Sequence, residues 1–217
     1  MGIVKPVRPL VVGPSSGPQD PFPLQMEGKV IRGYRRGSND LGIPTANLPV
    51  DHNQTPWISG VASGAYFGWV SLRLPPTEAS NQPARPGVDS SPSASSEFTI
   101  YPMVMSIGYN PHYRNTMRLA EVHVLHDFAG RDLYGVEMRL LIMGFIRLER
   151  AYPSTQDLID DIHMDCDVAC RSLKREGWSL RETGKGRLDG SWLLRDVEEA
   201  QGVIAIEEQR YEGGRET

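Results

Sequence analysis

Residues 119–146 read LAEVHVLHDFAGRDLYGVEMRLLIMGFI, and this stretch decides the fold class. It contains two runs, 119–128 and 133–146, that are rich in Val, Leu, Ile, Phe and Met, residue types that suit β-strands. No helical segment separates the two runs, and a parallel pair would need a long crossover connection. The stretch therefore predicts two antiparallel strands.

Three further runs of the same kind lie upstream, at 29–34, 64–74 and 98–107, and turn residues separate them. Several strands without intervening helices indicate an all-β domain, either an antiparallel barrel or a sandwich. A single helix is expected after Pro153, because Ser154 and Asp157 have the spacing of a capping box. Apolar residues then follow at helical spacing, so this helix should pack on the side of the sheet. They are Leu158, Ile162, Cys166, Ala169 and Leu173.

The chain of 217 residues, 39% of them hydrophobic, is long enough for one domain with extensions. Residues 1–24 form a Pro-rich arm, which either lies across the domain or hangs free. The domain itself is expected at 25–177, with a Pro/Ser-rich, disordered insertion at 75–96 that has little to bury. Residues 178–217 form a C-terminal extension, in which 197–210 has the composition of a short helix.

The net charge of −4 excludes an overall basic field that would collect nucleic acid or anionic membrane. The prolines of the arm prevent both a signal peptide and an amphipathic presequence. The most apolar segment, 140–146, is far shorter than a membrane span. We therefore expect a cytoplasmic protein without a membrane span or a nucleic-acid partner.

Residues 28–47, GKVIRGYRRGSNDLGIPTAN, combine several glycines with three arginines. Such a loop allows backbone N–H groups to approach phosphate, and the arginines supply charged donors. The segment is neither a Walker A loop nor a GxGxxG fingerprint. Taken alone, the glycines favour an ordinary surface loop over a phosphate-binding loop.

Three residues carry side-chain oxygens that could take part in metal binding or catalysis. Thr45 and Asn47, in the sequence PTAN, provide oxygen ligands suited to Mg²⁺, although the same residues also form ordinary turns. Glu121 lies in an alternating run in which Val122 and Val124 face the other side, so its carboxylate is a candidate general base or one half of a solvated Glu/His pair.

His163, Cys166 and Cys170 suggest a metal site by residue type. A structural zinc site needs four ligands, and Cys166 falls on the apolar stripe of the helix, which favours buried thiols instead. Two cysteines are too few for a disulfide framework.

Several segments together resemble the riboflavin kinase family, particularly its monofunctional eukaryotic form. They occur in the family's order, which makes coincidence a poor explanation. The segments are GKVIRGYRRGSNDLGIPTAN (28–47), SGAYFGWV (63–70), YPMVMSIGYNPHYRN (101–115), AEVHVLHDF (120–128), DLYGVEMRLLIMGFIR (132–147) and LIDDIHMDCDVA (158–169).

The resemblance implies a six-stranded antiparallel β-barrel with a C-terminal α-helix packed on its side. It also implies transfer of the ATP γ-phosphate to the ribityl 5′-hydroxyl of riboflavin, which yields FMN and ADP. Mg²⁺ is the implied cofactor, with Zn²⁺ or Mn²⁺ as alternatives. The chain contains no HxGH-type adenylyltransferase signature, so the expected product is FMN and not FAD.

The resemblance also assigns roles to individual residues. Glu121 matches the catalytic carboxylate, and Thr45 and Asn47 match the residues that hold Mg²⁺ and the nucleotide phosphates. Arg147 matches an arginine near the flavin end of the site. The remaining matches lie in a phosphate flap and in a second loop that closes over the flavin: Arg35, Arg36, Gly37 and Gly42 in the flap, and Asn110 at the start of the loop.

Two rival functions remain. One is a flavin- or nucleotide-binding barrel without turnover, which would not need Thr45, Asn47 and Glu121 together. The other is a protein-interaction module built on the Pro-rich arm and insertion. We expect a monomeric kinase that handles only small molecules, ATP and riboflavin.

Overall fold

The computed structural model describes residues 8–32, 42–50, 53–74, 98–109, 118–184 and 186–195. These residues form six strands and one long α-helix, and short 3-10 turns make up the other helical segments. The bounds are β1 Leu24–Lys29, β2 Ala46–Leu48, β3 Gly64–Arg73, β4 Phe98–Tyr109, β5 Arg118–Val124, β6 Glu137–Leu148 and α1 Thr155–Leu173.

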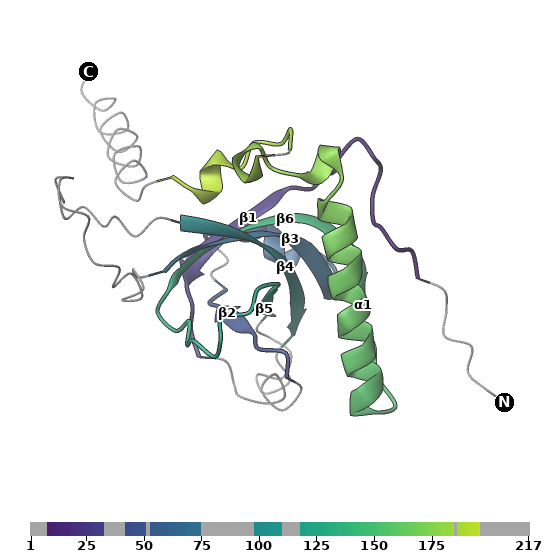
Figure 1. The fold of residues 1–217 in the computed structure, drawn as a ribbon. Coiled ribbons are helices and arrows are strands. Elements are labelled where there is room, and N and C mark those ends of the chain that lie inside the picture. The colour runs from purple at the N-terminus through teal and green to yellow at the C-terminus, as the bar shows by residue number, and fades with distance from the viewer. Residues whose placement is uncertain are drawn as a thin grey trace, which may run out of the picture.

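The six strands form one curled antiparallel sheet in the order β1-β6-β3-β4-β5-β2 (Figure 1). Just beyond β1, Ile31 makes an isolated bridge to Asn47 of β2, and Ile31 N donates to Asn47 O at 2.9 Å. This bridge joins the two edge strands, so the sheet closes around its interior. The expected all-β fold, six antiparallel strands with one helix on the side, is confirmed.

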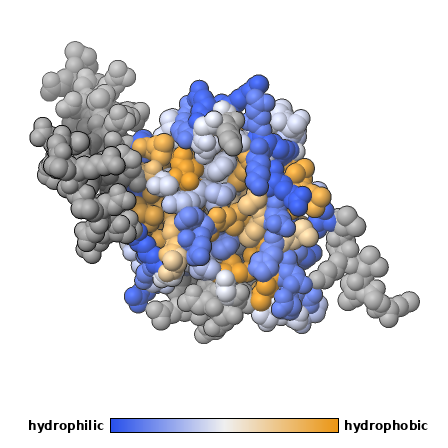
Figure 2. Space-filling view, in the orientation of Figure 1, coloured by the Kyte–Doolittle hydropathy of each residue, from blue (hydrophilic) through white to orange (hydrophobic). Residues whose placement is uncertain are grey.

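Alternation along the strands divides the apolar side chains into two clusters. The inner cluster fills the curled sheet and includes Tyr66, Met105, Val122 and Ile142. The outer cluster lies between the sheet and α1 and includes Phe67, Val104 and Leu173. Hydrophilic residues predominate on the exposed side of α1 (Figure 2).

Two strand predictions were wrong. The run 29–34 was expected as a strand, but β1 lies earlier, at Leu24–Lys29. Its register explains the shift: β1 pairs with β6 from Leu24 opposite Ile142 to Lys29 opposite Glu137, and only Met26 in it is buried. The second error is β2, which we read as part of a loop. It has three residues, too few for a visible alternation, and pairing with β5 stabilises it.

The start and end of α1 follow the sequence. Ser154 is the N-cap, and its Oγ accepts a hydrogen bond from Asp157 N at 3.1 Å. Ala169 and Leu173 are buried as expected, but the buried face also contains two carboxylates, Asp161 and Asp165. The sequence analysis did not anticipate these.

The N-terminal arm lies across the domain from residue 8 onward, beside the end of α1 (Figure 1). Val12 N donates to Ser172 Oγ at 2.9 Å, and Trp178 Nε1 donates to Pro14 O at 2.7 Å. Gly13 has φ of 73° and faces the Trp178 ring so closely that a Cβ would lie 2.4 Å from it. The arm therefore packs as part of the domain.

The segment after α1 covers another part of the outer face. Trp69 Nε1 donates to Trp178 O, and Ser71 Oγ donates to Leu193 O at 2.7 Å. The expected insertion at 75–96 and the expected short helix at 197–210 lie outside the described residues. Among the helices that the structure describes, none is long and apolar enough to cross a membrane.

Candidate active site

One row of residues runs across the sheet at a single level. Asn47 on β2 is paired with Glu121 on β5, Glu121 with Ser106 on β4, and Ser106 with Ala65 on β3. Ala65 is in turn paired with Arg147 on β6. Laterally paired residues point to the same face of a sheet. Because Val122 and Ala46 point into the core, this row lies on the outer face.

Glu121 is half-buried near the middle of this row. Burial raises the pKa of its carboxyl above the usual value, and the negative charge of Glu149 raises it further. A hydrogen bond with Ser106 opposes both effects. A carboxylate with a raised pKa is a stronger base, which suits the removal of a proton from a hydroxyl.

The segment 44–47 is fixed beside Glu121 by two contacts. Asn47 is buried and holds Ile31 through its backbone oxygen. His123 Nδ1 lies 2.9 Å from Pro44 O, and since a carbonyl oxygen only accepts, Nδ1 must carry the proton. Thr45 lies between these anchors and is partly exposed. Gly42 has φ of 69°, a left-handed backbone conformation that glycine adopts without strain. It therefore allows the turn by which the chain enters this segment.

Arg147 lies at the far end of the row, three strands from Glu121, which corresponds to roughly 14 Å at the usual strand spacing. Its guanidinium faces α1. Nη2 lies 2.7 Å from Asp165 Oδ2, and Nε lies 3.1 Å from Asp161 Oδ2. The arginine is thus bound to two buried helix carboxylates.

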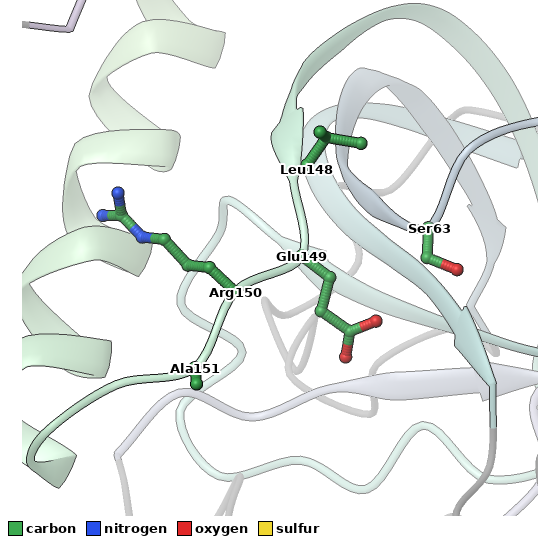
Figure 3. Close-up of a pocket in the computed structure, with 5 residues that line it drawn as sticks. All are labelled: Ser63, Leu148, Glu149, Arg150 and Ala151. Carbon is green, nitrogen blue, oxygen red and sulfur yellow. The ribbon is translucent and has the colours of Figure 1, made fainter.

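An open cavity of about 640 Å³ lies beside Arg147, at the connection between β6 and α1. Glu149 and Arg150 extend from this connection in different directions, and Arg150 points toward α1 (Figure 3). Glu149 also lies over β4, where its Oε2 would be 3.3 Å from a Cβ on Gly108. The cavity thus adjoins both Arg147 and the carboxylate that acts on Glu121. It is lined by Ser63, Leu148, Glu149, Arg150 and Ala151.

The structure thus brings Asn47 and Glu121 together on neighbouring strands, and Thr45 lies two residues before Asn47. Arg147 lies on the same face of the sheet, but three strands away from Glu121. Sequence reasoning missed Ser106 and Glu149, because their proximity to Glu121 arises only from strand register and chain reversal. Four predicted residues lie outside the described part of the chain, namely Arg35, Arg36, Gly37 and Asn110.

Within the described ranges, no group of three or more His, Cys, Asp and Glu side chains is arranged to hold a metal ion. Cys166 and Cys170 are both free thiols. Burial, together with nearby acidic groups, raises the pKa of the Cys166 thiol to about 12, so it stays protonated and unreactive at neutral pH. A hydroxyl and an amide oxygen, as in Thr45 and Asn47, are the neutral oxygen donors that accompany substrate phosphates around Mg²⁺.

Comparison with known proteins gives consistent results. Residues 20–173 match the family model of riboflavin kinase. The riboflavin kinase of Pyricularia oryzae is 54% identical over 199 residues, which cover 87% of this chain and 94% of the relative. That of Neurospora crassa is 48% identical and covers 87% and 97% of the two chains. The chain therefore belongs to the riboflavin kinase family.

The fold has a counterpart among solved structures. The crystal structure of riboflavin kinase from Trypanosoma brucei matches with a TM-score of 0.52 over 72% of this chain and 83% of that chain. The sequence identity is 24%, so this likeness supports the fold.

Proposed function

We infer that this protein is a riboflavin kinase, which phosphorylates riboflavin to FMN with ATP as the phosphoryl donor. The observation that carries the inference is the placement of Glu121. In a chain of this family, it is the half-buried carboxylate with a raised pKa that is paired directly with Asn47 of the PTAN segment. A binding barrel without turnover has no need for a basic carboxylate at this position.

In the proposed reaction, Glu121 accepts the proton of the ribityl 5′-hydroxyl. The 5′ oxygen forms a bond to the γ-phosphorus of ATP as the bond from that phosphorus to the bridging oxygen of ADP breaks. Phosphoryl transfer needs positioned groups and charge stabilisation more than covalent help from the protein. Ser106 holds the Glu121 carboxylate in place through its hydrogen bond.

We propose that Thr45 and Asn47 hold Mg²⁺ beside the phosphates. The fit rests on their oxygen donors and on the fixed backbone of this segment, which His123 and Ile31 anchor. A bound Mg²⁺ neutralises negative charge on the phosphates. Gly42 and the flap residues Arg35, Arg36 and Gly37 cover the phosphates in this proposal, and Asn110 begins the loop that closes over the flavin.

The cavity next to Arg147 is the proposed place of the flavin ring. It is within the size range of small-molecule sites, and it contains an apolar side chain, Leu148, which is 63% exposed. Contact with an aromatic ring would remove the apolar surface of this leucine from water, which is favourable in free energy. We also propose that the barrel unit 25–177 acts as a monomer in the cytosol.

The test is to incubate the purified protein with riboflavin, ATP and Mg²⁺ and to separate riboflavin, FMN and FAD by chromatography. We expect FMN as the only flavin product. Binding of riboflavin and ATP without any FMN would contradict the proposal and favour a barrel that has lost turnover.

A further inference from the structure

Two buried carboxylates of α1, Asp161 and Asp165, form the centre of an ionic cluster at the end of the cavity. Asp161 is 7% exposed and Asp165 is 1% exposed. Isolated charges at this depth would be costly, so each must have a charged partner. Three arginines supply the partners: Arg8 from the N-terminal arm, Arg147 from the end of β6 and Arg150 from the connection that follows β6.

Arg8 belongs to the N-terminal arm, outside the residues that match the family model. Its Nη1 lies 2.7 Å from Asp161 Oδ1, and its Nη2 donates to Asp165 Oδ1. The side chain is 14% exposed, so these are desolvated contacts and not surface ion pairs. Arg8 therefore bridges the two carboxylates from the side of the arm.

Arg150 connects the same cluster to the cavity. It lines the cavity, and its Nη2 lies 2.5 Å from Asp161 Oδ1, the oxygen that Arg8 also contacts. Figure 3 shows Arg150 extending toward α1 from the connection that forms the cavity wall. Two guanidinium groups that share one oxygen restrict each other in position and repel each other in charge.

Charge counting shows that Arg8 is not needed for neutrality. Two carboxylates are already balanced by Arg147 and Arg150, and Arg8 adds a third positive charge. Its loss leaves no unpaired buried carboxylate, because Arg147 still contacts both Asp161 and Asp165 and Arg150 still contacts Asp161. The domain should therefore tolerate substitution of Arg8 while the position of Arg150 changes.

We propose that Arg8 is a positioning residue for riboflavin binding: by sharing Asp161 Oδ1 with Arg150, it sets where the Arg150 side chain lies in the cavity wall. The N-terminal arm then contributes to the substrate site through the contacts of Arg8 with the cluster. This proposal rests on the proposed function, in which the cavity receives the flavin.

The experiment compares the full-length wild type with Arg8→Met, Arg8→Lys and Arg181→Met in steady-state kinetics. Arg8→Met keeps an unbranched apolar stem and removes the guanidinium with its charge, and it should raise the KM for riboflavin about three- to tenfold. The KM for ATP and kcat should stay within about twofold, which a general loss of structure would not produce. Arg8→Lys keeps the charge but loses the fork that reaches both carboxylates, so it should raise the KM for riboflavin by a smaller factor of about two.

Arg181→Met is the matched control. Arg181 forms an ion pair with Asp189, and both side chains are more than half exposed and remote from the cluster. This variant should leave both KM values unchanged. If Arg8→Met does not fold, the KM for riboflavin of Arg8→Lys is the measurement that tests the proposal.

An unchanged KM for riboflavin in a folded Arg8→Met protein, or in Arg8→Lys where the former does not fold, would overturn the proposal. So would an equal rise in the KM for ATP. If instead the wild type forms no FMN, the proposed function itself fails. In that case, equal riboflavin affinities of wild type and Arg8→Met, measured by quenching of flavin fluorescence, would also overturn the role of Arg8.

Discussion

Among single residues, Glu121 has surroundings that suit a base. It points outward from β5, yet Ser106, Asn47 and Glu149 surround it closely enough to limit its contact with water. The sequence predicted its face correctly, because alternation with Val122 and Val124 is a local property of the strand. It did not predict Glu149, which approaches through the chain reversal after β6 and leaves no local pattern.

Replacement of Glu121 by Gln should lower kcat about 10²–10⁴-fold, because the amide keeps the shape but cannot accept the proton. Calorimetry should show that riboflavin and ATP still bind with similar affinity. Glu176→Gln is the control, since Glu176 is exposed and forms its ion pair with Arg187 on the surface. Near-normal FMN production by Glu121→Gln would remove the base from the mechanism.

A second prediction concerns pH. Burial and the charge of Glu149 both raise the pKa of Glu121, so Glu149→Gln removes one of the two causes. The pKa of Glu121 should then fall, and the base should remain deprotonated to lower pH. We therefore expect the acid limb of the kcat/KM profile to move to lower pH in Glu149→Gln and to stay in place in Glu176→Gln. A shift toward higher pH would contradict the electrostatic coupling.

A third prediction addresses the metal. Thr45→Ala or Asn47→Ala should raise the Mg²⁺ concentration required for half-maximal rate by about tenfold or more, because each removes one oxygen donor. Titration of FMN formation against Mg²⁺ measures this. Thr183→Ala is the control, because the Thr183 hydroxyl donates only to Leu180 O in a remote turn. Superimposable Mg²⁺ curves for all variants would mean that the PTAN segment is an ordinary turn.

At the scale of elements, the sequence predicted the position of α1 but not all of the residues that the helix buries. The cap at Ser154 and the apolar stripe predicted its start and its packing. The stripe did not reveal that Asp161 and Asp165 are buried, because their partners Arg8 and Arg147 come from the arm and from β6. From sequence alone, the Asp residues of such a helix are expected to be exposed to solvent, because their distant charged partners cannot be identified. The three-residue strand β2 was missed for the same reason, since its partner β5 stabilises it.

The cluster on α1 should make the protein sensitive to acid. Burial alone would raise the pKa of Asp161, but the hydrogen bond from Tyr152 and the charges of the nearby arginines hold it below its usual value. A lowered pKa in the folded state means that the stabilisation is present above the unfolded pKa and is lost as the pH falls through the folded pKa. Stability should therefore decrease in that acidic window.

Asp161→Asn tests this directly. The variant leaves Asp165 as the one carboxylate of the cluster for three arginines, and Arg150 loses its contact with Asp161. It should therefore be less stable at neutral pH by about 3–5 kcal/mol. Its stability should also depend less steeply on pH in the acidic window. Urea unfolding at a series of pH values measures both effects. Asp189→Asn is the control, because Asp189 also has a lowered pKa but is exposed, and it should change the curve less. An unchanged acid dependence in Asp161→Asn would exclude the cluster as its source.

At the scale of the whole molecule, the N-terminal arm packs against α1 and Trp178, and the segment after α1 packs on the outer face of the curled sheet. Arg175 reaches from the end of α1 to Gly13 O at 2.8 Å, and Arg139 of β6 donates to Arg195 O. The sequence left the position of the arm open, because proline-rich composition specifies an extended backbone but not its docking site. These contacts show that both extensions are packed against the folded domain.

The connection between β3 and β4 permits the last prediction. Arg73 at the end of β3 is paired directly with Phe98 at the start of β4, so the strands already meet where the chain leaves the sheet. A two-residue Asn-Gly turn suits such an antiparallel pair. Replacement of 75–96 by this turn keeps Leu74, which packs against the inner cluster. It should therefore preserve the fold, and the smaller entropic cost of loop closure should leave stability unchanged or raise it by about 1–2 kcal/mol. The site row of Asn47, Glu121 and Ser106 lies at the other end of β4, so kcat and both KM values should stay within about twofold of the wild type. Thermal unfolding and FMN formation measure the two effects, and a variant with 75–96 replaced by a Gly/Ser linker of equal length is the control. A folded short-turn variant that no longer phosphorylates riboflavin, while the Gly/Ser variant does, would show that the length of this connection belongs to the site.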